Sequence, residues 1–157
     1  MPRLNMAYKR TEIGWPILLI VIVVVLFNQF MAKVTDEPDG VLHFIEVVEA
    51  VIILIVVPFF IMTVQVDKNI LSWSLCFGLF PQSVPIDSIE SIRIVDLSPL
   101  NGYGIRGDGA SKLWRISGSR AVSLQLADGR TVAIGVSDAD QLASAINSAI
   151  GATHVPK

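Results

Sequence analysis

The chain has 157 residues, the length of about one domain. Slightly more than half of them are apolar (52%), and the formal net charge is −2, which argues against a nucleic-acid-binding protein. A single cysteine, Cys76, leaves no partner for an intramolecular disulfide. The apolar excess is concentrated in the first 64 residues, whereas residues 65–157 carry 8 basic and 8 acidic side chains and resemble an ordinary soluble domain.

The first apolar segment covers residues 13–32 and contains no charged side chain. At about 1.5 Å per residue, a helix of this length matches the roughly 30 Å hydrocarbon core of a bilayer. The alternative is a cleaved signal peptide, whose apolar part is usually shorter and is followed by small residues, unlike Asn28–Ala32 here. The segment therefore predicts a transmembrane helix that follows a short cytoplasmic segment, residues 1–12.

A second apolar segment, residues 41–64, predicts a returning transmembrane helix, with residues 33–40 as a short external loop. Arg3, Lys9 and Arg10 precede the first helix, whereas the loop has one lysine against three acids. Because lysine and arginine favour the cytoplasmic side, we expect a multi-pass protein of the cell membrane with both termini in the cytoplasm. Pro58 predicts a kink in the second helix.

Three ionisable residues, His43, Glu46 and Glu49, follow one another at i, i+3 and i+6 in the second segment. Ionisable groups inside a membrane are costly and often mark a proton or metal site. The start of this helix can also project into the outer interface, where acids complement the positive end of the helix. Both interpretations remain open, and interfacial or helix-pairing roles are favoured.

From residue 65 the apolar pattern alternates, which predicts strands. The segments that flank Lys68–Asn69 predict one hairpin, and "AVSLQLADGRTVAIGV" predicts another through a type I′ turn at Asp128–Gly129. Ser137 is the expected cap of a C-terminal helix, with Asp140 in a capping-box-like position. We expect the hairpin and the helix to share a core formed by Leu124, Leu126, Val132, Ile134, Leu142 and Ile146.

The predicted fold class is therefore α+β. Two transmembrane helices precede an antiparallel barrel or sandwich in residues 65–151, which the C-terminal helix closes, and residues 152–157 form a tail.

Glycines at 102, 104 and 107 have the G-x-G-x-x-G spacing of a dinucleotide-binding turn. That site needs a helix that starts at the third glycine, because the helix N-terminus holds the pyrophosphate. The residues that follow, "DGASKLWRIS", are typical of a turn and a strand. The sequence therefore predicts a glycine-rich loop between strands and no bound dinucleotide.

The segments "SGSRAVSLQLADGRTVAIG" and "LASAI" resemble the end of bacterial PH-like domains attached to one or two transmembrane helices. The matching features are Gly104-Ile105-Arg106, a Ser117-Gly118 turn, the Asp-Gly hairpin and the closing helix. The resemblance covers roughly residues 60–150. It implies a PH-like fold in an integral protein of the bacterial inner membrane, and the matching motif contains no catalytic residue.

Residues 106–130 hold five cations against two acids: Arg106, Lys112, Arg115, Arg120 and Arg130. They could meet the phosphates of an anionic inner leaflet or a partner protein, or be ordinary strand-edge charges that block edge pairing. Neither histidine, His43 or His154, has a nearby nucleophile in the sequence, and no cysteine–histidine cluster has zinc spacing.

We therefore expect a non-catalytic interaction module without a cofactor. It would bind a partner protein or the inner leaflet, and it could form homo-oligomers through its helices. The alternative is a small oligomeric transport or metal- or proton-handling protein built around His43, Glu46 and Glu49.

Overall fold

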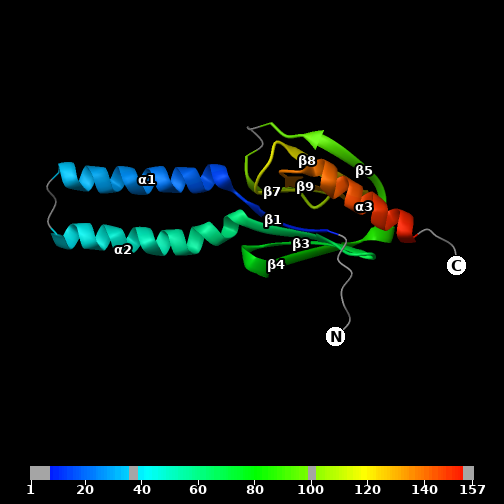
Figure 1. Cartoon of the computed structure of the whole chain (residues 1–157), viewed down its shortest axis with the longest axis horizontal. Helices are drawn as coiled ribbons and strands as arrows, with labels where there is room; N and C mark the ends of the chain where they lie inside the picture. Colours follow the sequence, from blue (N-terminus) through cyan, green and yellow to red (C-terminus); the bar gives the residue numbers. More distant parts are fainter. Residues whose placement is uncertain (1–7, 36–38, 99–101, 154–157) are drawn as a thin grey trace.

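The computed structural model describes residues 8–35, 39–98 and 102–153. Two long helices lie side by side and extend from one end of a β-rich domain (Figure 1). The first elements in chain order are β1 (Tyr8–Ile13), α1 (Trp15–Val34), α2 (Asp39–Val56) and the 3₁₀ turn η1 (Val57–Phe60). The chain is α+β, as predicted.

Strand β1 pairs in antiparallel register with β2 (Ile61–Val66), although both helices lie between them in the sequence. Ile13 at the end of β1 is opposite Ile61 at the start of β2, and the Gly14 N–H donates to the Phe60 carbonyl (2.8 Å). The helical pair is therefore an insertion between two neighbouring strands of one sheet.

This insertion corrects two predicted boundaries. The predicted N-terminal segment, residues 1–12, contains most of β1 and so contributes to the domain, which does not begin at residue 65. The second helix ends at Val56 rather than at residue 64, because residues 61–64 belong to β2. Pro58 lies in η1, so the α-helix ends before the proline instead of kinking at it.

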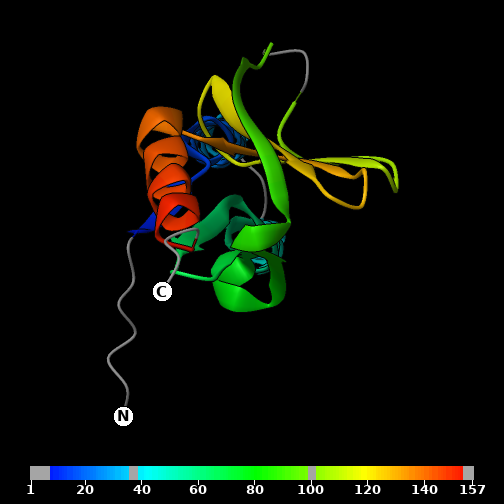
Figure 2. The ribbon, with the colours of Figure 1, turned by 90° about the vertical axis from the view of Figure 1, so that its right-hand side faces the viewer.

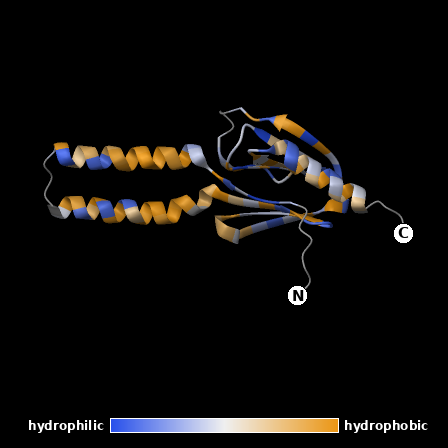
Figure 3. Cartoon of the chain, viewed as in Figure 1, coloured by the Kyte–Doolittle hydropathy of each residue, from blue (hydrophilic) through white to orange (hydrophobic). Residues whose placement is uncertain are grey.

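The two helices expose many large apolar side chains, and α1 has no buried residue. Figure 3 shows apolar colouring along both helices, with polar positions of α2 in the half remote from the domain. Within the described ranges, one helix, α1, is long and apolar enough to cross a membrane. Helix α2 carries Asp39, Glu46 and Glu49 among its 18 residues, so its predicted membrane span is not confirmed.

The first sheet has the strand order β1-β2-β3-β4 and is antiparallel throughout. Its remaining strands are β3 (Ile70–Leu75) and β4 (Phe80–Pro85), joined by the turn η2 (Cys76–Gly78). The predicted hairpin at Lys68–Asn69 is confirmed, since Val66 of β2 is opposite Leu71 of β3. Strand β4 lies at the edge of the sheet, where its two prolines break no ladder with a further strand.

The second sheet has the strand order β5-β8-β9-β7-β6. After the turn η3 (Ile86–Ser88), its strands are β5 (Ile89–Asp96), β6 (Gly104–Gly107), β7 (Ser111–Arg115), β8 (Arg120–Leu126) and β9 (Thr131–Val136). Strands β7 and β9 are parallel, which corrects the expectation of a wholly antiparallel fold. The glycine-rich segment forms a β-hairpin, in which Gly104–Gly107 pairs with β7.

The hairpin of β8 and β9 is present, but its turn differs from the predicted type I′. Of its central residues, Gly129 has a positive φ (83°) and Asp128 does not. The Gly129 N–H donates to the Leu126 carbonyl, and the Leu126 N–H donates to the Arg130 carbonyl (both 2.9 Å). This is the pattern of a three-residue loop with a glycine at the left-handed position.

Helix α3 (Ala139–Thr153) packs against β2 of the first sheet and against β5 and β8 of the second. Asp138, not Ser137, caps it, because the Asp138 Oδ1 accepts from the Gln141 N–H (3.1 Å). The six predicted core residues are all buried. Within the described residues the two sheets remain separate and face each other across the core, where the rings of Trp73 and Trp114 meet edge to face at 6.0 Å.

Candidate functional site

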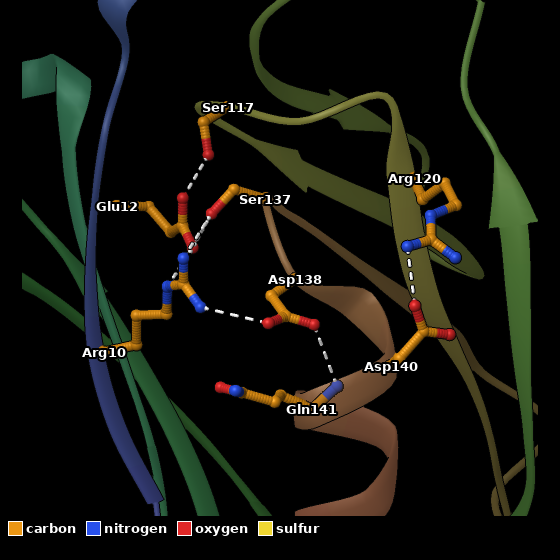
Figure 4. Close-up of polar contacts among 8 residues, drawn as sticks. All are labelled: Arg10, Glu12, Ser117, Arg120, Ser137, Asp138, Asp140 and Gln141. Carbon is orange, nitrogen blue, oxygen red and sulfur yellow. Dashed lines mark hydrogen bonds and ion pairs between the residues drawn. The ribbon is translucent and has the colours of Figure 1, made fainter.

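A polar cluster joins the start of α1 to the domain (Figure 4). Its centre is Glu12 of β1, whose carboxylate accepts from the hydroxyls of Ser117 (2.5 Å) and Ser137 (2.8 Å). The guanidinium of Arg10 lies 3.1 Å from the same carboxylate and 3.5 Å from Asp138. Only 3% of Glu12 is exposed, so these partners replace the water that a buried carboxylate loses.

The cluster ties three distant parts of the chain together. Glu12 lies three residues before α1, Ser117 lies in the β7–β8 connection, and Ser137 directly precedes the cap of α3. Because α1 follows β1 without a flexible linker, the orientation of this helix is fixed against both sheets and α3. We call Arg10, Glu12, Ser117, Ser137 and Asp138 the junction cluster.

Sequence reasoning missed the junction cluster because polar residues occupy core-facing positions of β1. Arg10 and Glu12 are opposite Val64 and Met62, both fully buried. The segment therefore lacks the apolar alternation that marks a strand. Its partners are more than a hundred residues away in the sequence, and no short-range signal indicates them.

Arg115, one of the five candidate cations, is buried and contacts backbone carbonyls. Its guanidinium donates to the carbonyls of Gly118 (2.8 Å) and Ser98 (2.8 Å) and lies 4.8 Å from the centre of the Tyr103 ring. With 3% of the residue exposed, Arg115 organises the loops around β7 and cannot contribute to an exposed cationic surface.

Two further candidates are engaged in ion pairs. Arg120 lies 2.6 Å from Asp140 of α3, and this hydrogen bond raises the pKa of Arg120. The Arg130 guanidinium lies 2.6 Å from Asp128. The pKa of the Asp128 carboxyl is lowered, mainly because this carboxylate accepts a hydrogen bond from the Arg130 backbone N–H. The two arginines flank opposite ends of the β8–β9 pair, because Arg120 is opposite Val136 whereas Arg130 precedes β9.

Arg106 and Lys112 lie on the β6–β7 hairpin and are exposed. Within the described part of the chain, neither forms an ion pair. They point to opposite faces of the hairpin, since Arg106 is opposite Leu113 and Lys112 is opposite Gly107. Figure 2 shows this hairpin projecting sideways, next to the β8–β9 turn that carries Arg130. The structure therefore gathers Arg106, Lys112 and Arg130 in one region and separates Arg120 from them.

The ionisable residues of α2 do not converge on one point. Glu49 accepts a 2.6 Å hydrogen bond from the Asn28 side chain of α1. His43 Nδ1 lies 3.8 Å from Glu46, and both side chains are largely exposed. Within the described ranges, no group of three or more histidine, cysteine, aspartate or glutamate side chains is placed to hold a metal ion.

Comparison of the chain with protein-family models finds no match. Searches of curated proteins and of solved structures also find none. The PH-like resemblance therefore remains a prediction that rests on the residues named above.

Proposed function

We propose that the chain is a membrane-anchored, non-catalytic interaction module whose domain is held against the cytoplasmic face of the bilayer by a two-helix hairpin. The observation that carries this proposal is the pairing of Ile13 with Ile61. The chain leaves the domain and returns to it at two opposed residues of one sheet. Both ends of the helical hairpin must therefore lie on the same side of any membrane that α1 enters.

This constraint supports two crossings. The 20 residues of α1 extend about 30 Å, the thickness of the hydrocarbon core. The chain must then return to the side of the domain, and α2 is the segment that makes this return. A carboxylate is costly to place inside a membrane, and that of Glu49 has a hydrogen-bond partner in Asn28. His43 and Glu46 lie in the first turns of α2, which would be at the level of the outer interface.

The charges flanking the helices support a cytoplasmic domain. Lys9, Arg10 and Lys68 lie in the sequence near the end that joins the domain, whereas residues 33–40, around the far end of the helices, have Lys33 against three acids. Basic residues near the ends of membrane helices favour the cytoplasmic side. The domain and both termini would then be cytoplasmic.

The proposed binding surface is the exposed hairpin of Arg106 and Lys112, with Arg130 beside it. Figure 1 places β7 at the end of the domain nearest the helices. Lysine and arginine near an anionic leaflet are each worth about 1 kcal/mol. The phosphates of that leaflet are therefore the ligands we propose, and a protein partner with an acidic surface is the competing one.

Site-directed labelling tests the topology. In a Cys76→Ala background, a cysteine at Thr35 between the helices and one at Asn69 in the domain are probed with a membrane-impermeant maleimide on intact cells. We expect Thr35→Cys to react in intact cells and Asn69→Cys to react only after the cells are lysed. Equal reaction of both positions from one side would show that the hairpin does not cross the membrane.

Hydrogen exchange tests the binding surface. The full chain is placed in nanodiscs of neutral lipid and in nanodiscs that contain phosphatidylglycerol. We expect slower exchange in residues 104–115 in the anionic discs, and loss of this difference in the Arg106→Ala, Lys112→Ala variant and at high salt. Arg93→Ala, which removes an exposed cation from β5, is the matched control. A difference that survives the double substitution would argue for a partner other than lipid phosphate.

A further inference from the structure

The connection between β3 and β4 exposes large apolar side chains. Phe77 is 76% exposed and Leu79 is 75% exposed, and Phe80 beside them is 46% exposed. No charged residue occurs from Ile70 to Ile86. We call residues 76–80 the apolar loop. A large exposed apolar patch on a protein surface usually marks a contact with another protein or with a membrane.

The backbone of the apolar loop is strained. Cys76 and Phe77 have positive φ angles of 51° and 58°, and Gly78 follows with 102°. A left-handed conformation is unfavourable for a residue that has a Cβ atom. The Cys76 side chain is buried, but the Phe77 ring lies in solvent and returns little stability to the domain. The strained, exposed phenylalanine therefore calls for a role outside the folding of the domain.

The loop lies where the helices leave the domain. Phe80 of β4 is opposite Leu75 of β3, and Leu75 is opposite Met62 near the start of β2. The ring of Phe80 lies 6.1 Å from that of Phe59, which belongs to η1 and is also half exposed. Because η1 continues directly from α2, the apolar surface of the helix extends without a gap onto the apolar loop.

We propose that the apolar loop inserts into the interfacial region of the leaflet from which the two helices emerge, with Phe77 and Leu79 among the lipid headgroups and upper acyl chains. This inference rests on the proposed membrane anchoring. The lipid interface is favoured as the occupant because the patch is continuous with η1 and α2 and contains no charge. The loop adds a third contact beside the two helices, which fixes the tilt of the domain on the membrane and so the height of the Arg106–Lys112 hairpin.

Fluorescence quenching tests this insertion in the full chain. In a Cys76→Ala background, Leu79→Cys is labelled with an environment-sensitive dye, and the protein is reconstituted into vesicles of phosphatidylethanolamine and phosphatidylglycerol. We expect blue-shifted emission that nitroxide-labelled lipid quenches strongly and aqueous iodide quenches weakly. Asn69→Cys, which precedes β3 at the end remote from the apolar loop, is the matched control and should show the reverse.

A second variant separates insertion from folding. Phe77→Gly removes the ring and suits the positive φ, so we expect an unchanged or higher melting temperature in detergent but weaker quenching of the Leu79 dye by lipid nitroxide. Strong iodide quenching at Leu79 in vesicles would overturn the proposal. So would dye–dye contact between copies, which would assign the patch to self-association. If Thr35→Cys also fails to react with the maleimide from outside, the membrane anchoring itself is wrong. If the topology is as proposed but the dye at Leu79 is accessible to iodide, only the insertion of the loop is refuted.

Discussion

One buried carboxylate, that of Glu12, explains much of how the helices are attached to the domain. Two serine hydroxyls and the Arg10 guanidinium surround it, so its charge is compensated inside the protein. Such a group is costly to bury alone, and removing one member of the cluster leaves the others without partners. At the residue scale, the attachment of α1 therefore depends on side chains that do not resemble a core.

Replacing Glu12 by alanine tests this dependence. The buried Ser117 hydroxyl would lose its acceptor, and unmatched buried polar groups cost about 1–3 kcal/mol each. We expect Glu12→Ala to lower the free energy of unfolding by at least that range, measured by urea unfolding of the full chain in detergent with the buried Trp73 and Trp114 as reporters. Glu90→Ala removes an exposed glutamate of β5 and should leave the stability nearly unchanged.

Cys76 provides a pH-dependent test of the loop that contains it. Burial raises the pKa of the Cys76 thiol. A group whose pKa is raised by folding adds stability below its unfolded pKa, about 8.5 for cysteine, and this stability is lost as the pH rises through the folded value. The melting temperature should therefore fall more steeply above about pH 8.5 in the natural protein than in Cys76→Ala. Parallel curves for the two proteins would contradict a buried thiol.

At the scale of secondary structure elements, the two helices are joined by a polar contact between apolar surfaces. Asn28 of α1 donates to Glu49 of α2, between Gln29, which follows Asn28, and the apolar residues that follow Glu49. The contact gives the Glu49 carboxylate a hydrogen-bond partner on the neighbouring helix. Glu46 is more than half exposed and pairs with His43 instead.

A double-mutant cycle measures the contact between the helices. Asn28→Ala, Glu49→Ala and the combined variant are compared in a reversible unfolding assay in detergent. Hydrogen bonds between membrane helices are worth about 0.6 kcal/mol on average and about 1.7 at most, so we expect a coupling energy in that range. Glu46→Ala is the matched control and should show no coupling to Asn28. A coupling energy near zero for Glu49 would return this residue to the list of candidate transport or metal groups.

At the scale of the whole molecule, local patterns predicted the parts of the fold that are local. The alternation around Leu124 and Val132 predicted the β8–β9 hairpin, and the helical spacing of Leu142 and Ile146 predicted α3, all of which are confirmed. Strand β1 was missed because its partner lies beyond both helices, and because its core-facing side chains are polar. The parallel pairing of β7 with β9 likewise has no signal in either segment.

The site residues follow the same division. Composition singled out five cations, but their neighbours in space decided their roles: Arg115 is buried, while Arg120 and Arg130 are paired with acids. The apolar loop was not predicted from the sequence. Its exposure depends on three successive positive φ angles that no residue type except Gly78 indicates.

The insertion of the helices between two paired strands makes a last prediction about the molecule as a whole. Because the Gly14 N–H bonds to the Phe60 carbonyl, replacing residues 15–59 by Asn-Gly should close β1 and β2 into an ordinary two-residue hairpin. The resulting domain retains the junction cluster and all strands of both sheets. We expect this domain to unfold cooperatively and to show the circular dichroism spectrum of a mixed α+β protein. A low concentration of detergent would prevent association through the exposed Phe77 and Leu79.

The matched comparison is the fragment of residues 65–157, which lacks β1 and residues 61–64 of β2. Without these residues, Trp73 and Leu75 of β3 lose their partners Val64 and Met62 on β2, and Glu12, the acceptor of the Ser117 and Ser137 hydroxyls, is absent. This fragment should therefore remain unfolded or aggregate under conditions in which the closed domain melts cooperatively. A fragment as stable as the closed domain would show that β1 and β2 are dispensable, and that the helical hairpin is appended to the domain rather than built into its sheet.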